Sequence, residues 1–268
     1  MRIGLIGFGT IGRAVARAID ERRAGTAELA AVLVRDLDKA RATGITEHGV
    51  MITADPDEFF AAEIDVVVEA AGHSGLKQYC ARALRGGLDV LAVSVGAFAD
   101  DDFSSSVRRA AEENGCRLLV PSGALGALDA VAAAAVGALD QVVLVARKPP
   151  AAWKGTPAED VALRAVTEPV CFYEGRAREA AKLFPQNVNV VAALSLAGIG
   201  FDRTIIKMYS DPSVKHNTFE LHAAGEFGEL RLDLKNKPYP ENPKTGHLVV
   251  MSVIRAIRRL QESVIVGW

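Results

Sequence analysis

The six residues GFGTIG, at positions 7–12, constrain the fold of this chain more than any other stretch. They supply Gly7, Gly9 and Gly12 in the spacing G-x-G-x-x-G, which by itself is a weak signal. Here the glycines directly follow the apolar run RIGLI and open a stretch with helical spacing at residues 11–22. A strand, a glycine turn and a helix in this order are the context in which the motif binds the diphosphate of a dinucleotide. The start of the chain therefore predicts a dinucleotide-binding unit.

The three glycines have separate roles in such a turn. Gly7 allows the sharp change of direction after the strand, and Gly9 lets the backbone approach the diphosphate. Gly12 allows the helix to pack closely on the strand. Thr10 and Ile11 lie at the helix N-terminus, whose unpaired N–H groups and partial positive charge favour a phosphate. The alternative is a structural turn that binds no ligand.

Strand and helix signals alternate through the first half of the chain. Runs of Val, Leu and Ile, typical of strands buried on both faces, are separated by Ala-, Arg- and Glu-rich stretches with helical spacing. We expect strands at residues 3–6, 29–34, 65–70, 90–95 and 117–120, and helices at 11–22, 76–84 and 103–113. This alternation predicts an α/β fold with a Rossmann-type, doubly wound parallel sheet.

The second half of the chain has a different pattern. We expect a strand at 141–149, a helix at 175–185 and strands at 204–211, 219–227 and 228–236, the last two joined as a hairpin with glycines at the bend. A helix at 241–261 would have Asn242 as its cap and Pro243 in its first position. An antiparallel sheet after a parallel one predicts a second, smaller α+β domain.

These patterns predict that the chain is organised in three segments. We expect a dinucleotide-binding domain at residues 1–125 and a substrate and dimerisation domain at 126–240. The remaining segment, 241–268, is expected to be a C-terminal helix that could return to the first domain.

Composition and charge exclude several classes of function. The formal net charge is -2, which gives no electrostatic reason to expect nucleic acid or an anionic membrane as a partner. No apolar run reaches the roughly 18 residues needed to span a bilayer. The three cysteines, Cys80, Cys116 and Cys171, form no CxxC pair, so we expect neither a metal site nor a disulfide framework. A reduced, cytoplasmic compartment is the default for such a chain.

The choice between NAD and NADP is open on the sequence alone. Loops that prefer NAD place Asp or Glu at the end of the second strand, where it binds the ribose hydroxyls. That strand ends near Val34, which Arg35 and Asp36 follow. Asp36 could bind the ribose, Arg35 could pair with the additional phosphate of NADP, or both could be solvated loop residues. Ala71 and Gly72 are further candidates for cofactor contact, because ligands bind at the carboxyl ends of such strands.

Four later motifs occur in a fixed order after the opening glycines. They are SVGAFAD at 94–100, PSGALGALDA at 121–130, FPQNVNVVAALSLAG at 184–198 and GEFGELRLDLKNKPYPENPKT at 225–245. With them, the chain resembles the L-aspartate dehydrogenases over nearly its whole length. The resemblance implies oxidation of L-aspartate to iminoaspartate with NAD or NADP, followed by release of oxaloacetate and ammonia. It further implies a Rossmann domain with an α/β second domain, a homodimer, and a supply of iminoaspartate to NAD biosynthesis.

The same motifs imply where the nicotinamide lies. By resemblance, Ala124 of the SGALG loop touches the cofactor, and Asn189 of NVNV reaches it from the second domain. Small residues at Gly123 and Ala124 would let backbone groups approach a flat ring, and an amide can bond the carboxamide as both donor and acceptor. The alternatives are a glycine turn before a buried helix for SGALG, and helix entry for Asn189.

The chain departs from the family at the position of its catalytic histidine. That histidine lies in an N-x-H-E motif, and here the matching residues are Asn217, Thr218, Phe219 and Glu220. Phe219 therefore occupies the histidine position, and a phenyl ring can neither accept nor donate a proton. General acid–base catalysis contributes about 10²- to 10⁴-fold in rate, so an unreplaced loss would leave aspartate oxidation slow or absent.

Three residues could take over the proton transfer. His222 lies three residues further on, which in an extended strand puts it on the opposite face from Phe219. His216 precedes the strand, so its direction is freer. Lys148 could act as a proton-transferring amine if burial lowered its pKa. Each of them could instead be an ordinary surface side chain.

A dicarboxylate substrate would also need cations near the cofactor. Arg147, Lys148 and Lys244 are candidates, because strand ends beside a cofactor cleft are where such side chains are useful. His73, which follows the run VVVEAAG, could face the cofactor or cap a loop. All of these could also be solvated.

Three functions fit these residues. The first is an NAD(P)-dependent dehydrogenase of the aspartate dehydrogenase type. The second is a related imine or carbonyl reductase whose pocket has changed with Phe219. The third is a nucleotide-binding protein that keeps the cofactor fold without turnover. Phe219 separates the first function from the other two.

Overall fold

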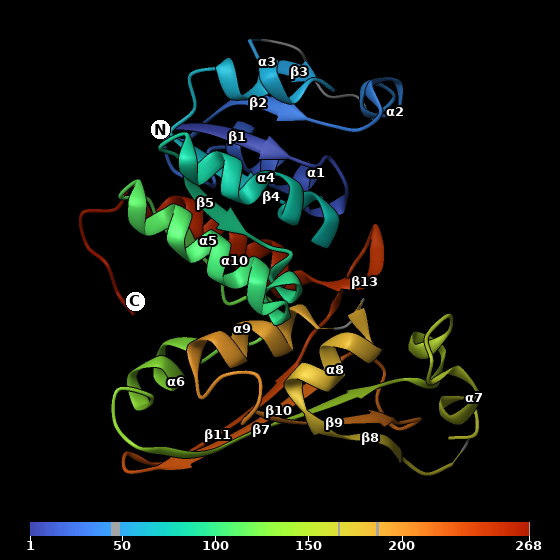
Figure 1. The fold of residues 1–268 in the computed structure, drawn as a ribbon. Helices are drawn as coiled ribbons and strands as arrows, with labels where there is room; N and C mark the ends of the chain where they lie inside the picture. The colour runs from blue at the N-terminus through green and yellow to red at the C-terminus, as the bar shows by residue number, and fades with distance from the viewer. Residues whose placement is uncertain (44–48, 166, 186–187, 268) are drawn as a thin grey trace. The chain divides into compact units, whose positions relative to one another are not determined.

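The structure, a computed structural model, describes residues 1–43, 49–165, 167–185 and 188–267, with the backbone alone for Pro243 and Lys244 (Figure 1). The chain divides into two compact units. The first comprises residues 1–121 and 250–266, and the second comprises residues 122–249 together with Gly267. Within the described residues, no helix is long and apolar enough to cross a membrane.

The first unit contains a parallel sheet of six strands in the order β3-β2-β1-β4-β5-β6. The strands are β1 (Arg2–Ile6), β2 (Glu28–Leu33), β3 (Met51–Thr53), β4 (Val66–Glu69), β5 (Asp89–Ala92) and β6 (Leu118–Leu119). This order confirms the predicted Rossmann-type sheet and places its topological switch point between β1 and β4. The strand β3 was not predicted, because three residues are too few to show a period.

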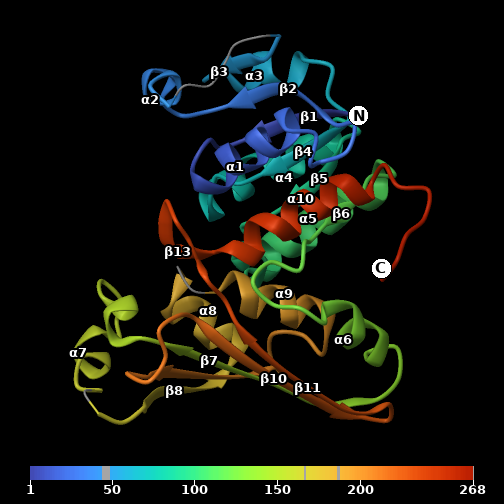
Figure 2. The ribbon, with the colours of Figure 1, turned by 180° about the vertical axis from the view of Figure 1, so that it is seen from behind.

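Helices cover both faces of this sheet, as Figures 1 and 2 show. They are α1 (Thr10–Asp20), α2 (Leu37–Arg41), α3 (Pro56–Ala61), α4 (His73–Arg85) and α5 (Asp101–Glu113), with a 3₁₀ turn η1 (Val95–Ala99). Side-chain caps begin three of them: Asp36 accepts a hydrogen bond from Lys39 N–H, Asp55 accepts one from Asp57 N–H, and Asp100 accepts one from Phe103 N–H. Buried apolar side chains such as Leu5, Phe59 and Leu84 fill the layers between sheet and helices.

The second unit contains a five-stranded sheet in the order β11-β10-β7-β9-β8. Its strands are β7 (Leu139–Lys148), β8 (Val170–Arg176), β9 (Ile205–Ser210), β10 (Thr218–Gly225) and β11 (Gly228–Lys235). The sheet is mixed rather than antiparallel throughout, because β7 and β9 run parallel, and the connection between them contains the strand β8 as well as helices. The predicted hairpin of β10 and β11 is confirmed, with Gly225 opposite Gly228 at the bend.

Helices cover one face of the second sheet. They are α6 (Leu128–Ala134), α8 (Ala177–Leu183) and α9 (Asn189–Ala197), while η2 (Pro150–Trp153) and α7 (Glu159–Ala162) follow β7 (Figure 1). Alternate residues of β7, from Val142 to Lys148, are buried against this covered face. The intervening residues face the other side, as the period of two requires.

The expected helix at 241–261 begins later than predicted. Residues Asn242–Gly246 form the strand β13, which pairs with β12 (Pro238–Tyr239), and the helix α10 runs over His247–Arg259. Asn242 and Pro243 are therefore neither its cap nor its first turn. The backbone N–H of His247 bonds to the carbonyl of Lys237, which closes the small hairpin where the helix starts. Residues 250–266 belong to the first unit.

Candidate active site

The glycine loop of the first unit has the geometry of a diphosphate cradle. Gly7 adopts a φ of 95°, and its N–H bonds to the carbonyl of Leu33 at 2.9 Å, which ties the loop to the end of β2. A side chain at Gly7 would meet the carbonyl oxygen of Ala70 at 2.7 Å, so the loop closes directly against the residues after β4. Only glycine satisfies both the backbone angle and this contact.

Gly9 and Gly12 differ in what surrounds them. A Cβ at Gly12 would run into the Gly7 carbonyl oxygen, so the first turn of α1 can pack on the loop only with glycine there. A Cβ at Gly9 would meet nothing within 4 Å. Gly9 occupies the cap position of α1 and provides no side-chain hydrogen bond. The open space above Gly9, beside the N-terminus of a helix, fits a bound diphosphate.

The carboxyl end of β4 holds a buried carboxylate that sequence reasoning missed. Glu69 is only 1% exposed, and it pairs in register with Ile6, the last residue of β1. Its Oε1 accepts hydrogen bonds from Ala71 N–H at 2.7 Å and from the Ser94 hydroxyl at 2.9 Å, and its Oε2 accepts one from Ser94 N–H at 3.0 Å. The only signal in the sequence was a charged residue at the end of the apolar run VVVE.

This carboxylate shapes the residues predicted to touch the cofactor. Ala71 and Gly72 are exposed at the β4–α4 turn, and Gly72 N–H donates to the Ser94 hydroxyl at 3.0 Å. Burial raises the pKa of Glu69, and hydrogen bonds from Ser94, Ala71 and Gly72 oppose that shift. Burial, with a smaller contribution from Glu69, also raises the pKa of the Cys80 thiol to about 12, which keeps that thiol neutral.

Three other predicted residues of the first unit have local roles. His73 is the first residue of α4, four residues beyond the last residue of β4. Asp36 accepts a hydrogen bond from Lys39 N–H at 2.9 Å and thereby caps α2. Arg35 and Asp36 are both exposed, and contact of either with the cofactor stays a prediction.

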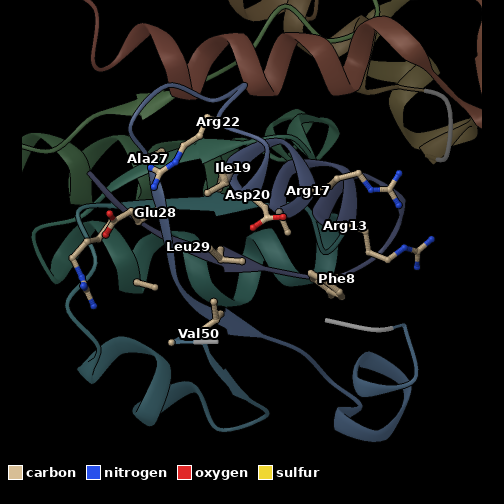
Figure 3. A pocket seen from close by; sticks show the side chains of 14 residues that line it. Phe8, Arg13, Arg17, Ile19, Asp20, Arg22, Ala27, Glu28, Leu29 and Val50 are labelled. Atoms are coloured by element: carbon tan, nitrogen blue, oxygen red, sulfur yellow. The ribbon is translucent and has the colours of Figure 1, made fainter. Parts of the chain in front are cut away.

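A separate pocket of about 670 Å³ in the first unit runs along α1 and β2 (Figure 3). Figure 3 shows Arg13 and Arg17 extending from α1 near Phe8, while Arg22 lies at the other end beside Ala27. Phe8 is the one residue that this pocket shares with the glycine loop. Gly9 does not line this pocket, and neither does any described residue after β4, so it lies apart from the cradle at Gly9.

The SGALG loop opens the second unit. Gly123 and Ala127 both have a φ of 62°, and Leu125 between them is fully buried. The left-handed angle is easy for Gly123 but unfavourable for an alanine. The Nδ2 of Asn236 donates to the Ala124 carbonyl at 2.9 Å, which fixes the residue predicted to touch the nicotinamide. Asn236 was also missed by sequence reasoning, since nothing marks it among the polar residues after β11.

A second pocket, of about 620 Å³, lies entirely within the second unit. Every ionisable side chain in its described lining is basic, so we call it the basic pocket, and apolar residues such as Pro149 and Ala151 supply much of the remaining surface. The basic and amide side chains of the lining include Lys148, Lys154, Lys215, His216, Asn217 and Asn236. Of the proposed proton-transfer residues, Lys148 and His216 are therefore brought together, while Phe219 and His222 are not among the described residues that line the pocket.

Strand register brings the central residues of this pocket into one row. Thr218 lies opposite Arg147 on β7 and opposite Lys235 on β11. Asn236 N–H bonds to the Asn217 carbonyl at 2.9 Å, so this pairing continues one position beyond β10 and β11, and the same register extended along β7 puts Lys148 in line with Asn217. Because side chains alternate along a strand, all three point to the same face of the sheet.

Lys148 is the most unusual group in the row. It is only 9% exposed, and its ammonium lies 4.9 Å from the centre of the Trp153 ring. Burial lowers the pKa of Lys148 from 10.5 to about 8. At this pKa about a tenth of the amine is neutral at about pH 7, far more than for an ordinary lysine, which suits a group that accepts a proton.

Phe219 is buried on the same face as Lys148. It lies opposite Ala146, which places Lys148 two residues further along the neighbouring strand. Such diagonal neighbours have Cα atoms on the order of 7–8 Å apart. A histidine at position 219 would thus lie beside Lys148, although its position in this chain is filled by a core phenyl ring.

The remaining candidates lie elsewhere. His222 is on the opposite face of β10, with Nε2 4.0 Å from a Glu229 carboxylate oxygen. Arg147 also faces that side, where it is paired with Glu220 at 2.6 Å and Asp211 at 3.5 Å. Asn189 is exposed as the first residue of α9, and Val188 rather than Asn189 occupies the cap position. The Lys244 side chain lies outside the described part of the chain.

Both halves of the chain match known families. Residues 7–121 match the NAD-binding domain of homoserine dehydrogenase, and residues 129–260 match the C-terminal domain of aspartate dehydrogenase. The L-aspartate dehydrogenase of Ralstonia pickettii is 40% identical over 266 residues, covering 96% of each chain. That of Methanocella arvoryzae is 38% identical over 274 residues, covering 99% of each chain.

Solved structures show the same fold. The crystal structure of aspartate dehydrogenase from Thermotoga maritima superimposes with a TM-score of 0.80 at 24% identity, covering 100% of this chain and 99% of that one. The amine dehydrogenase of Mycobacterium smegmatis gives a TM-score of 0.59 at 14% identity, covering 97% of this chain and 92% of that one.

Proposed function

Since this chain belongs to the L-aspartate dehydrogenase family, we propose that it oxidises L-aspartate to iminoaspartate with NAD or NADP, and that water then releases oxaloacetate and ammonia. The chain is an NAD(P)-dependent oxidoreductase of the Rossmann type. The observation that carries the proposal is the basic pocket of the second unit, in which the buried Lys148 shares a row with Asn217 and Asn236. Asn236 connects that row to the SGALG loop.

The glycine loop would hold the cofactor. Gly7 and Gly12 set the turn, and the N-terminus of α1 above Gly9 would bind the diphosphate. When bound, the dinucleotide supplies the hydride acceptor. Ala71 and Gly72 would contact it at the end of β4, and Gly123, Ala124 and Asn189 would contact it from the second unit.

Lys148 would move the proton in place of the missing histidine. The substrate ammonium must lose one proton before its α-carbon can give up a hydride, because the resulting iminium draws on the nitrogen lone pair. A neutral Lys148 accepts that proton and becomes an ammonium, so charge is conserved within the pocket. A pKa of about 8 lets the same amine release the proton again in each cycle. His216, which also lines the pocket, is the second candidate for this role.

Lys154 and Lys215 give the pocket its preference for carboxylates. Both line the pocket with Lys148, and the only other ionisable side chain in its described lining is that of His216. A dicarboxylate would find cations there without facing a like charge. This charge pattern favours an acidic amino acid over a neutral one.

The wider setting follows from the family. We place substrate binding and dimer formation in the second unit, and the enzyme in the cytoplasm. Its cysteine side chains are free thiols in the described residues, which suits a reducing compartment. The iminoaspartate product would serve NAD biosynthesis.

The test is the appearance of reduced nicotinamide with L-aspartate, measured separately with NAD and NADP. Wild type and Phe219→His are compared, with Phe219→Leu as the matched apolar control. We expect wild type to turn over and Phe219→His to gain about 10²-fold or more in kcat, because a second acid–base group joins Lys148. Phe219→Leu is expected to show no gain, because leucine moves no proton.

Two outcomes would favour other functions. Turnover by Phe219→His alone would mean that Lys148 does not replace the histidine. Cofactor binding without turnover by either protein would favour a related imine or carbonyl reductase, which the buried phenyl ring beside Lys148 makes the second candidate. If a panel of imines and carbonyl compounds also gave no turnover, a non-catalytic NAD(P)-binding protein would remain.

A further inference from the structure

The buried carboxylate of Glu69 has no part in the chemistry described above. It lies at the topological switch point of the first sheet, where β4 pairs with β1 and ligands of this fold bind. Glu69 is not itself exposed, since only 1% of its surface is accessible. It therefore acts on a ligand through the residues that it holds.

Glu69 connects two segments that follow neighbouring strands. The first is the β4–α4 turn, in which Ala71 N–H donates to the carboxylate. The second is Ser94, which follows β5 and donates both its N–H and its hydroxyl to the carboxylate. The Ser94 hydroxyl then accepts from Gly72 N–H, which closes a ring of hydrogen bonds between the two segments.

The ring extends to the glycine loop by direct contact. Ala70 N–H bonds to the Ile6 carbonyl at 2.8 Å, and the Ala70 carbonyl lies where a Gly7 side chain would be. A displacement of the β4–α4 turn would therefore reach the loop that cradles the diphosphate. All of these groups belong to the first unit.

The hydrogen-bond pattern uses both carboxylate oxygens of Glu69 as acceptors of backbone N–H groups. Each group that contacts Glu69 is a donor, so both of its oxygens act as acceptors. An amide in the same place would turn an N–H group toward one of these donors. Glutamine is therefore close in shape but wrong in hydrogen bonding.

We propose that Glu69 is a positioning residue for the dinucleotide, which fixes Ala71, Gly72 and Ser94 against the glycine loop in the conformation that binds the cofactor. The inference needs a dinucleotide at this loop but no particular substrate. It can thus fail or succeed independently of aspartate oxidation.

The test is the dissociation constant for NAD and NADP, measured by titration calorimetry without substrate. We expect Glu69→Gln to raise it about 10- to 100-fold, the range for hydrogen bonds to a charged group. At saturating cofactor, kcat should stay within a few-fold of wild type, so the loss appears in the KM for the cofactor. Ser94→Ala, which keeps the carboxylate, should raise the dissociation constant about threefold to tenfold.

Asp89→Asn is the matched control. Asp89 begins β5, at the amino end of the same sheet, and accepts hydrogen bonds from Arg117 N–H and the Arg117 guanidinium. The same chemical change there should lower the melting temperature without changing cofactor affinity. Unaltered affinity in Glu69→Gln, or a loss no larger than in Asp89→Asn, would overturn the inference. If Glu69→Gln does not fold, unaltered affinity in Ser94→Ala overturns it.

Discussion

The glycine loop of the first unit and the basic pocket of the second differ in which atoms form them: backbone in the loop, and side chains in the pocket. The loop is made of backbone, and its function depends on Gly7 and Gly12 having no side chain. The pocket is made of side chains, and its function depends on the register that aligns Asn236, Asn217 and Lys148. Damage to the loop should therefore appear in folding and cofactor affinity, and damage to the pocket in the rate of the chemical step.

The largest expected effect tests the pocket side of this contrast. Lys148→Met keeps the length and apolar body of the side chain but removes the amine. We expect kcat with L-aspartate to fall about 10²- to 10⁴-fold, because a proton-transfer group is lost, while cofactor affinity stays unchanged. Steady-state kinetics with calorimetric titration of NAD would measure both. Full activity in Lys148→Met would transfer the role to His216, and His216→Gln is the variant to compare.

The same residue gives a pH-dependent effect on stability. The pKa of Lys148 is about 8 in the folded state, where the side chain is buried, and 10.5 in the unfolded chain, where it is solvated. Between these two pH values the unfolded chain therefore binds more protons than the folded one. The free energy of unfolding should thus rise with pH across that window and be level below it, a change of about 3 kcal/mol at most. Lys148→Met should lack the rise and be the more stable protein at about pH 7. Urea denaturation of both proteins at about pH 7 and pH 10 measures the difference.

Two alanine substitutions separate the roles of the glycines. Gly12→Ala should destabilise the protein by about 2 kcal/mol even without cofactor, because the new methyl group collides with the Gly7 carbonyl. Gly9→Ala should keep the melting temperature of wild type and still bind the dinucleotide less tightly, since its methyl group enters only the space left for the diphosphate. Thermal unfolding with and without NAD distinguishes them. A stable Gly12→Ala protein would contradict the packing argument.

The smallest expected effect concerns the residue that joins the pocket to the SGALG loop. Asn236→Ala removes the donor to the Ala124 carbonyl, and we expect kcat/KM for the cofactor to fall about fivefold, in line with the loss of one ordinary hydrogen bond. Asn242→Ala, at another pocket-lining amide, is the control. Equal losses in the two variants would show that pocket polarity, rather than the position of Ala124, is responsible.

The contrast also explains what could be predicted from the sequence. Local signals were sufficient for the loop, since glycine spacing, a preceding apolar strand and a following helix all lie within a dozen residues. They also predicted the alternation that gives the parallel sheet, and the hairpin at Gly225. The short strand β3 and the hairpin of β12 and β13 were not predicted, because very short strands and a strand that contains proline show little hydrophobic periodicity.

The residues missed in the site share a different cause. Asn236 and Glu69 act through partners far along the chain, Ala124 and Ser94, and the pairing depends on tertiary register. No spacing rule on a single sequence links residues separated in this way. Lys148 could be proposed in advance only because its role was conditional on burial, which the structure supplies.

The return of α10 has a consequence for how the chain is synthesised. Residues 250–266 complete the first unit, where Val253 and Ile257 are fully buried and Gln261 bonds to Thr26 and the Ala24 carbonyl. The ribosome synthesises the glycine loop long before residues 250–266, which complete the same unit. Residues 122–249 of the second unit form one continuous segment that can fold during translation, whereas the first unit needs residues 250–266, which are synthesised after that segment. A nascent chain arrested before residue 250 should accordingly show a protease-resistant second unit and a first unit that is still digestible.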